Sequence, residues 1–333
     1  MKNKKIKFIN KNSQTRKNSQ RRKNSLRRKN SQHRKNSQHR KTFKRMNCSP
    51  AVKGKTPVNG SCFTDPVLRQ LKTAYNKHHS TDKILDENPT IIWNELKLRL
   101  STCDKEDCWL NEITDQSVRD KLDKQIFAPD QPDDWKQNNS AWLSNFDICD
   151  VLKQYEEPFP NFKVIGPTPI DFDTRPPDMN GQCVWQDLCT FSIEKMISSN
   201  KTKLGIVFNI DVHTGKGIHW VSMFVDLDDN YIFYLDSAGD KILPEIDALV
   251  KRIIDQGVKI GKTIHFHENC PTEHQSGENE CGMYALYFII TMLTGKTEKA
   301  ELNTFMDKIE FFKNKRIPDS YVNKFRKIYF NYS

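Results

Sequence analysis

The feature that most constrains the fold is an apolar run near the C-terminus, Cys281–Leu293, which contains no charged residue. The run is longer than most strands. It is also too short for the roughly 20 residues that span a bilayer, and Thr291 interrupts it. Thr294-Gly295 follows as a typical helix C-cap. The run therefore predicts a buried helix, and no membrane partner is expected.

Charge is distributed very unevenly along the chain. The 333 residues include 53 Lys or Arg and 42 Asp or Glu, a formal net charge of +11. Residues 1–45 contain 19 of the basic residues and no acidic residue, so they carry +19 and residues 46–333 carry −8. A negatively charged body argues against a protein whose whole surface binds nucleic acid. An electrostatic partner is therefore expected to contact residues 1–45.

The basic segment is built from a six-residue repeat. Five units between Asn10 and His39 share Lys-Asn-Ser-Gln, with Leu26 once in place of Gln, and a sixth unit, Arg40–Arg45, has diverged. A period of six matches neither helix nor strand, and the units offer almost nothing to bury. Residues 1–45 are therefore predicted to be a disordered tail.

Several functions of this tail remain open. It is suited to contact DNA or RNA through phosphate neutralisation, to act as a nuclear-import signal, or to be phosphorylated at Arg-Lys-Asn-Ser. It is equally compatible with a solvated extension produced by repeat slippage. The repeat contains no Phe, Tyr or Trp before Phe43, so base stacking is not indicated.

Residues 46–128 are predicted to form a small helical region. Thr64-Asp65-Pro66 is typical of a helix start. The helix that follows has one apolar face, made by Val67, Leu68, Leu71 and Tyr75. Two more short helices are predicted at Ile91–Leu100 and Val118–Phe127.

The nine cysteines are an odd number in a chain too long to need a disulfide scaffold. Free thiols in a reducing compartment are therefore expected, and no signal peptide is visible at Met1–Asn10. Four of the cysteines fall in or beside the helical region: Cys48, Cys62, Cys103 and Cys108. They have enough ligands for a structural zinc, but their spacing is not the usual paired Cys-x2-Cys, so ordinary thiols are the favoured alternative.

Residues 129–333 are predicted to be an α+β catalytic domain, entered through a polar linker at Pro129–Trp135. Helical periodicity is found at Phe146–Glu156 and Val184–Ser198. Runs of Val, Ile, Phe and Tyr predict three strands, Leu204–Ile210, Ile218–Val225 and Tyr231–Leu235. Leu227–Asn230 supplies the turn between the last two strands.

The predicted hairpin brings a histidine and an aspartate together. His219 lies near the start of one strand and Asp236 at the end of the next. With the turn centred near Asp228-Asp229, the two residues lie almost opposite each other with the parity to share a face. A carboxylate beside an imidazole fixes its tautomer and stabilises the imidazolium.

Cys281 is a candidate third member, because it begins the predicted buried helix. The positive end of a helix dipole favours a thiolate, and a neighbouring histidine accepts the thiol proton. The backbone N–H of Cys281 offers one donor for an oxyanion, and Gln275, six residues upstream, offers a side-chain donor.

These residues resemble the clan of cysteine peptidases that contains the adenovirus protease and the SUMO proteases. The resemblance rests on His219-Trp220, Asp236-Ser237, and Gln275 with five residues before Cys281-Gly282. It implies a papain-like, adenain-like core, in which a central mixed sheet accompanies a nucleophile-bearing helix. Over about residues 130–333, it also implies the catalytic residues His219, Asp236, Gln275 and Cys281. Glu280 departs from the Asp usual in the cellular SUMO proteases, but it keeps the charge.

The same resemblance implies a substrate class. Trp142-Leu143 is similar to the segment that opens the SUMO-protease catalytic domain, where two tryptophans cover a groove for a Gly-Gly tail. Here these tryptophans are Trp142 and Trp220. The helical region and the Lys- and Asn-rich chain resemble polyprotein-processing proteases of large cytoplasmic DNA viruses. Such enzymes are implied to cut structural precursors after Gly-Gly during virion maturation.

The expected function is therefore a thiol protease that acts on a Gly-Gly-type protein substrate, with no metal or organic cofactor. If viral, it is expected in the virion and host cytoplasm; otherwise, in the cytoplasm or nucleus. A SUMO- or ubiquitin-type deconjugating enzyme remains an alternative. So does a nucleic-acid-associated virion protein that uses the fold as a scaffold, although the four ordered residues argue against it.

Three weaker constellations are present. His265, His267 and Cys270 offer a weak metal-ligand set, and a structural edge strand is favoured. Asp211 and His213 are an alternative acid–base pair in a polar loop. Cys183 and Cys189 flank a predicted helix start, with no histidine in phase with either.

Overall fold

The computed structural model describes residues 42–332. The chain divides into two units, residues 1–44 and 45–333, and the architecture described below is that of the second unit. The predictions of a disordered repeat and of its polyanion, nuclear-import and phosphorylation functions fall almost entirely outside the described residues.

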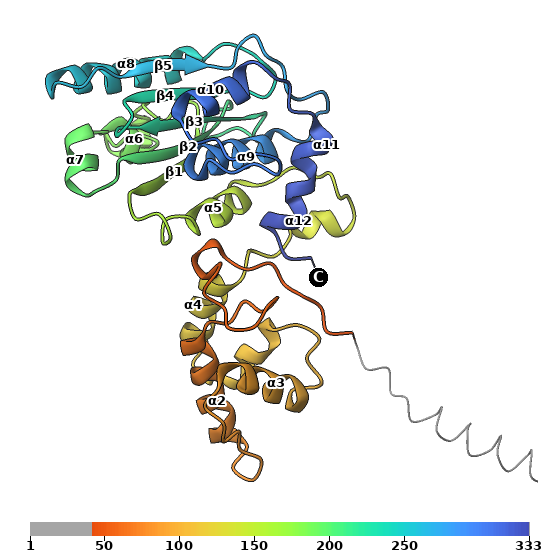
Figure 1. Ribbon diagram of the computed structural model, residues 1–333. Helices are drawn as coiled ribbons and strands as arrows, with labels where there is room; N and C mark the ends of the chain where they lie inside the picture. Colours follow the sequence, from red (N-terminus) through yellow and green to blue (C-terminus); the bar gives the residue numbers. More distant parts are fainter. Residues whose placement is uncertain (1–41, 333) are drawn as a thin grey trace, which may run out of the picture. The chain divides into compact units, whose positions relative to one another are not determined.

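The core of the second unit is a five-stranded mixed sheet (Figure 1). Its strands lie in chain order: β1 (Phe162–Pro169), β2 (Lys203–Asn209), β3 (Trp220–Asp226), β4 (Tyr231–Leu235) and β5 (His265–Glu268). β1 is parallel to β2, and β5 is parallel to β4. The pairs β2–β3 and β3–β4 are antiparallel. The expected α+β fold with a central mixed sheet is therefore confirmed.

The three predicted strands correspond to β2, β3 and β4 within one or two residues at each end. The sequence pattern does not indicate β1, because Gly166, Pro167 and Pro169 interrupt it. Proline removes a donor from a strand, and an edge strand such as β1 tolerates that loss.

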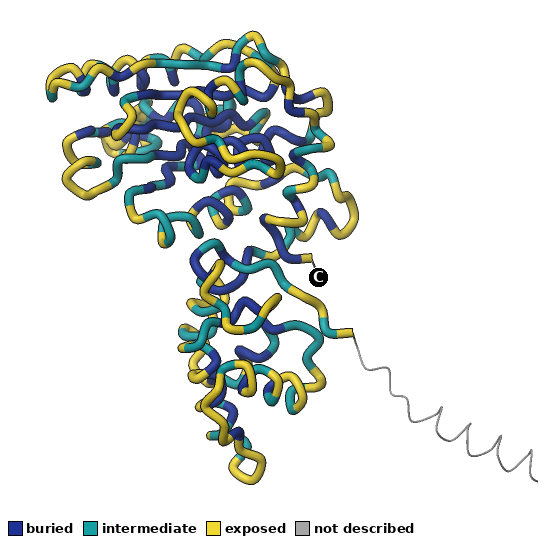
Figure 2. The backbone as a smooth tube through the Cα atoms, in the orientation of Figure 1, coloured by how far each residue is buried: buried dark blue, intermediate teal, exposed yellow. Residues whose placement is uncertain are grey.

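Helices cover both faces of the sheet, and each face has its own apolar core. One face packs against α5 (Asn145–Lys153), α9 (Cys281–Thr294), α10 (Phe305–Lys313), α11 (Asp319–Val322) and α12 (Arg326–Tyr329). The other packs against α6 (Gln186–Cys189), α7 (Ile193–Ser198) and α8 (Pro244–Lys259). Strand alternation sends Phe233 to the first face and Ile232 and Tyr234 to the second. Figure 2 shows the buried centre in dark blue.

Helix α9 is the buried helix expected from the apolar run. All of its residues from Cys281 to Leu293 are buried, and it ends at Gly295 with φ +68°. That conformation suits glycine, so the predicted C-cap is confirmed. The cost of burying so long a helix is small, because its backbone groups are hydrogen-bonded within the helix.

The single helix predicted at Val184–Ser198 is wrong, because the structure has two short helices, α6 and α7. The Ser192 side chain accepts a hydrogen bond from the backbone N–H of Lys195 and so begins α7 anew. A serine inside an expected helix competes for backbone groups in this way and favours a cap.

The helical region contains α2 (Asp65–His78), α3 (Pro89–Arg99) and α4 (Gln116–Ile126), as expected. Helix α2 follows Thr64 and buries Leu68, Leu71 and Tyr75. Phe63 stacks on Trp109 with ring centroids 5.6 Å apart. Short 3-10 helices occur at Pro50–Val52, Asp107–Glu112, Asp133–Lys136, Pro177–Met179 and Asn323–Phe325.

Six of the nine cysteines form disulfides, paired as Cys48–Cys62, Cys103–Cys108 and Cys183–Cys189. The prediction of free thiols in a reducing compartment is therefore wrong for these six. The four N-terminal cysteines form two disulfides, so their thiols are not available as a zinc site. The prediction used the length of the whole chain, whereas the small helical region has a small core that local cross-links can stabilise.

The predicted polar linker at Pro129–Trp135 is not simply exposed. Trp135 is only 1% exposed, and its ring packs edge-on against Phe330 at 5.0 Å. Near it, the Asn331 side-chain amide donates to the Asn47 carbonyl at 3.1 Å and to the Ala128 carbonyl at 2.8 Å. The C-terminal residues therefore tie the helical region to the sheet domain, and the linker contributes a buried tryptophan that packs against them.

Candidate active site

The hairpin of β3 and β4 positions the histidine and the aspartate. Its register pairs Asp226 with Tyr231 and Ser222 with Leu235, which centres the turn between Asp228 and Asp229, as expected. His219 immediately precedes β3 and Asp236 immediately follows β4. Their side chains meet, with His219 Nε2 2.8 Å from Asp236 Oδ1. The predicted contact between these two residues is therefore present.

Asp236 is held by a small set of hydrogen bonds that the sequence analysis did not foresee. Its backbone N–H donates to Asn269 Oδ1 at 2.9 Å, and Asn269 Nδ2 donates back to its carbonyl at 2.7 Å. The N–H of Ala238 donates to the same Asp236 oxygen that faces His219. Asn269 lies on the loop after β5, and no sequence pattern marks it. These bonds fix the carboxylate against the imidazole.

Cys281 is the first residue of α9 and is only 1% exposed. Burial lowers the pKa of His219, but hydrogen bonds and charge interactions with Asp236 and Cys281 raise it, and the net result is a pKa of about 10. His219 therefore interacts with both the Asp236 carboxylate and the Cys281 thiol. Since Nε2 faces Asp236, Nδ1 is the nitrogen left for Cys281.

Gln275 lies in the loop between β5 and α9 and is buried. Its side-chain oxygen accepts a hydrogen bond from Ser237 Oγ at 2.7 Å. Its Nε2 donates to the Gly277 carbonyl at 2.7 Å. Gln275, in the loop that leads to Cys281, is therefore hydrogen-bonded to Ser237, the residue that follows Asp236.

The two predicted groove tryptophans flank the start of α9. Trp220 Nε1 donates to the Leu143 carbonyl at 3.0 Å, and Trp142 Nε1 donates to Asn279 Oδ1 at 2.6 Å. A side chain at Gly282 would lie 3.1 Å from Leu143 Cβ and 3.4 Å from Trp220 Cδ1. The glycine after Cys281 therefore lets the two groove walls approach the helix.

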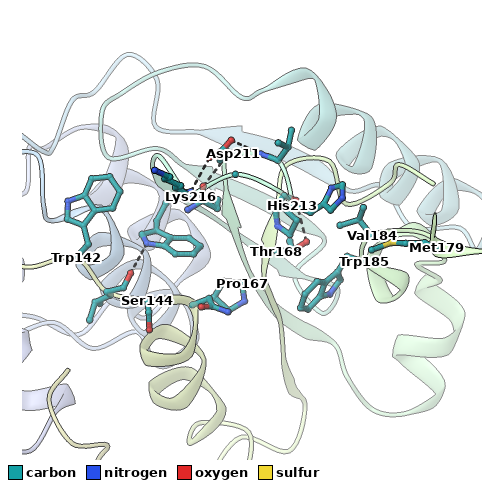
Figure 3. A pocket seen from close by; sticks show the side chains of 18 residues that line it. Trp142, Ser144, Pro167, Thr168, Met179, Val184, Trp185, Asp211, His213 and Lys216 are labelled. Atoms are coloured by element: carbon teal, nitrogen blue, oxygen red, sulfur yellow. Dashed lines mark hydrogen bonds between the residues drawn. The ribbon is translucent and has the colours of Figure 1, made fainter. Parts of the chain in front are cut away.

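Trp142 and Trp220 are among the residues that line a cavity of about 670 Å³. Figure 3 shows Trp142 at one end and Met179, Val184 and Trp185 gathered at the other. Apolar side chains therefore line both ends of the cavity. A groove with these dimensions and walls is suited to hold an extended peptide segment.

The weaker constellations do not form further sites. Residues 42–332 contain no group of three or more His, Cys, Asp or Glu side chains placed to hold a metal ion. His265 and His267 lie on β5, and burial lowers the pKa of His267. The predicted pairing of His213 with Asp211 is wrong, because His213 Nδ1 lies 2.6 Å from Asp171 Oδ2. Both Asp211 oxygens instead accept backbone N–H groups, from Val212 and Gly217.

Within the described part of the chain, no helix is both long and apolar enough to cross a membrane. Helix α9, the most apolar helix, is 14 residues long and is covered by the sheet and the C-terminal helices.

Comparison with known proteins shows that this arrangement is similar to that of known cysteine proteases. Residues 199–329 match the Ulp1 protease family, C-terminal catalytic domain. The chain is 25% identical over 261 residues to an Acanthamoeba polyphaga mimivirus protein named as thiol protease R355, and the match covers 72% of this chain and 82% of that protein. It is 27% identical over 197 residues to a cysteine protease of African swine fever virus, covering 57% and 68% respectively.

The crystal structure of an African swine fever virus protease has the same fold. It superposes with a TM-score of 0.57 at 19% identity and covers 88% of this chain and 98% of that one. A mixed sheet, a cysteine at the start of a buried helix and a histidine–aspartate pair beside it define a cysteine protease. The chain is therefore a cysteine protease whose residues 199–329 match the Ulp1 protease family, and its relatives include these two viral proteases.

Proposed function

We propose that Cys281 is the nucleophile of a thiol protease that cleaves protein substrates after Gly-Gly-type sequences. The observation that carries the proposal is His219, held at 2.8 Å by Asp236 and with its pKa raised by both Asp236 and Cys281. A nucleophile, a base and a group that orients the base form the minimal arrangement for acyl transfer.

In the first step the Cys281 thiolate attacks the carbonyl carbon of the scissile bond and His219 is the imidazolium. The raised pKa of His219 favours this charge state at neutral pH. As the tetrahedral intermediate collapses, His219 Nδ1 donates its proton to the leaving amine, which departs. A water molecule, deprotonated by His219, then hydrolyses the thioester and returns the enzyme to its starting state.

The oxyanion that forms in each step is expected to be stabilised by two N–H donors. One is the backbone N–H of Cys281, which has no carbonyl to bind at the start of α9. The other is Gln275 Nε2. Donors fixed before the reaction stabilise the developing charge without reorganisation.

The cavity walls support a substrate with small residues before the scissile bond. Trp142 and Trp220 are both anchored by their indole N–H groups, and Leu143 and Gly282 close the space between them and α9. We expect the space beside these walls to admit a glycine pair and to exclude a branched side chain. The proposed biological substrates are structural precursor proteins cleaved during virion maturation, in the virion and the host cytoplasm.

Deconjugation is a second candidate with the same chemistry. One of the African swine fever virus relatives, 27% identical over 184 residues, is named as a SUMO-1 cysteine protease. A SUMO- or ubiquitin-type C-terminus also ends in Gly-Gly, so the groove does not separate the two candidates. The scaffold-only alternative is disfavoured, because His219 contacts Asp236 and also interacts with Cys281.

The basic tail is proposed to contact DNA or RNA, or to serve nuclear import, through its 19 Lys and Arg residues. Cleavage rates measured with and without residues 1–45, in the presence and absence of DNA, test the first of these. Equal rates under all four conditions would exclude a tail that activates the protease on DNA.

The proposed function is tested with a substrate panel: a Gly-Gly-X peptide, the same peptide with Ala-Ala-X, and SUMO and ubiquitin C-terminal reporters. Wild-type protein is expected to cleave the Gly-Gly-X peptide and not the Ala-Ala-X peptide, and Cys281→Ala is expected to cleave neither. Cys149→Ser, which changes a free cysteine on α5, is the matched control and is expected to retain activity. Faster turnover of SUMO or ubiquitin reporters than of the peptide would favour deconjugation.

A further inference from the structure

The buried hydroxyl of Ser237 has no part in the chemistry described above, yet it contacts the amide proposed to bind the oxyanion. Ser237 is 1% exposed, and its Oγ lies 2.7 Å from Gln275 Oε1. Its carbonyl also accepts the backbone N–H groups of His274 and Gln275, each at 2.9 Å. Three hydrogen bonds therefore connect this one residue to the loop that carries Gln275.

The hydrogen-bond chemistry fixes which way the Gln275 amide points. The Gly277 carbonyl can only accept, so the group that faces it at 2.7 Å must be the amide nitrogen. The amide oxygen must then face Ser237, and the Ser237 hydroxyl must donate. One of the two Nε2 hydrogens is used by Gly277, and the other remains for the substrate.

The position of Ser237 next to Asp236 gives this contact a second consequence. Asp236 orients His219, and the following residue holds Gln275, so one dipeptide supports both halves of the site. The backbones also approach closely beyond it: a side chain at Gly239, whose φ is +81°, would lie 2.8 Å from the Glu273 nitrogen. The loop after β4 and the loop before α9 therefore pack directly against each other.

We propose that Ser237 is a positioning residue that keeps the Gln275 amide nitrogen turned toward the reacting carbonyl. The inference rests on the proposed function. Without the hydroxyl, the amide oxygen loses its only donor among residues 42–332. Only the bond from Nε2 to the Gly277 carbonyl then orients the amide, so the side chain rotates or flips more readily. A flipped amide presents an oxygen to the oxyanion, which is repulsive where an N–H would be attractive.

The test compares Ser237→Ala, Gln275→Ala and the double variant on the Gly-Gly-X peptide. Loss of an oxyanion donor costs about 10²- to 10³-fold in kcat, so Gln275→Ala is expected in that range. Ser237→Ala is expected to lose about tenfold in kcat with little change in KM, because the bond to Gly277 remains. The double variant is expected to be no slower than Gln275→Ala alone, since Ser237 acts through Gln275.

Three controls separate positioning from a general structural effect. Ser222 on β3 is a fully buried serine whose hydroxyl has no hydrogen-bond partner among the described residues, so Ser222→Ala should leave kcat unchanged. The rate at which iodoacetamide alkylates Cys281, followed by peptide mass spectrometry, should be the same in Ser237→Ala and wild type. Ser237→Cys, which fills the same space with a weaker donor, should give an intermediate kcat.

The proposal is overturned if Ser237→Ala has wild-type kcat, or if its loss adds fully to that of Gln275→Ala. It is also overturned if alkylation of Cys281 slows in parallel with kcat, because Ser237 would then act through Asp236 and His219. A wild-type enzyme that does not cleave the peptide, or a Cys281→Ala variant that does, contradicts the proposed function instead.

Discussion

Two histidines that lie six residues apart in the chain each pair with an aspartate, and the surroundings of the two pairs differ. His219 and Asp236 meet at 2.8 Å, and His213 and Asp171 meet at 2.6 Å. The side chains of the first pair are 17% and 8% exposed, and those of the second are 28% and 15% exposed. The first histidine also interacts with Cys281, whereas the second lines the cavity and closes a loop through its backbone N–H.

The comparison shows that distance alone does not identify a catalytic pair. The pair of His213 and Asp171, here called the outer pair, has the shorter contact. Asp171 also accepts the His213 backbone N–H, so this pair acts as a clamp that holds the loop. In the inner pair, His219 and Asp236, the aspartate is held by Asn269 and the histidine interacts with Cys281, the proposed nucleophile. The catalytic role proposed for His219 needs a third group, and Cys281 at the start of α9 is the candidate.

The largest expected effect separates the two histidines. His219→Ala is expected to lower kcat for the Gly-Gly-X peptide by on the order of 10⁴-fold or more, because nucleophile and base act as a unit. His213→Ala, the matched control, is expected to retain kcat, and any effect of the changed cavity wall should appear in KM. Equal losses in the two variants would contradict the assignment of His219 as the catalytic base.

Substitution of the two aspartates should likewise lower kcat much more for Asp236 than for Asp171. Asp236→Asn keeps the size of the side chain but removes the charge that orients and stabilises the imidazolium, so a loss of about 10²- to 10⁴-fold in kcat is expected. Asp171→Asn should change kcat little. If Asp171→Asn is the more damaging variant, the outer pair would have to belong to the catalytic machinery.

The pH dependence sharpens the contrast further. The pKa of His219 is raised from 6.5 to about 10, so its protonated form persists through neutral pH and is lost as pH rises toward 10. Activity that needs the imidazolium should therefore fall on the alkaline side. In Asp236→Asn a major cause of the raised pKa is gone, so this fall should move to lower pH.

Stability should follow the same titration. The contribution of the His219 interactions to folding is complete below pH 6.5 and is lost as pH rises through the folded-state pKa. A thermal unfolding series from pH 6 to pH 10, with Asp236→Asn as the reference, measures this loss. An Asp236→Asn curve parallel to that of the wild type would contradict it.

The smallest expected effect is on the outer pair. Breaking a partly exposed His–Asp contact should cost about 0–1 kcal/mol of unfolding free energy, and less at high salt. His213→Ala should therefore lower Tm slightly while leaving the alkylation rate of Cys281 unchanged. A large drop in Tm would show that this loop clamp is part of the stable core.

Much of the site was predictable because local rules determine it. The turn at Asp228-Asp229 sets the hairpin register, and register with strand parity places His219 beside Asp236. The apolar run and Gly295 define α9 and therefore put Cys281 at a helix N-terminus. The tryptophans came instead from resemblance, since no local pattern indicates that Trp142 reaches Asn279 across more than a hundred residues.

The rest depends on contacts that a linear reading does not show. Asn269 and Ser237 are ordinary polar residues until two loops from different strands pack together. His213 pairs with Asp171 and not with its sequence neighbour Asp211. The loop after β1 brings the Asp171 carboxylate to 2.6 Å from His213 Nδ1. Helix α8 was not predicted, although its pattern is present in the sequence. Pro244 is followed by apolar residues at helical spacing: Ile246, Leu249, Val250 and Ile253.

The most direct test of the account is to trap the nucleophile with a peptide that ends in Gly-Gly and carries an electrophile in place of the scissile carbonyl. Mass spectrometry of the labelled protein locates the adduct among Cys149, Cys270 and Cys281, the three free cysteines. The account predicts one adduct, at Cys281, that forms in wild type and His213→Ala but not in His219→Ala. An adduct at Cys149 or Cys270, or equal labelling of Cys281 in His219→Ala, would contradict it.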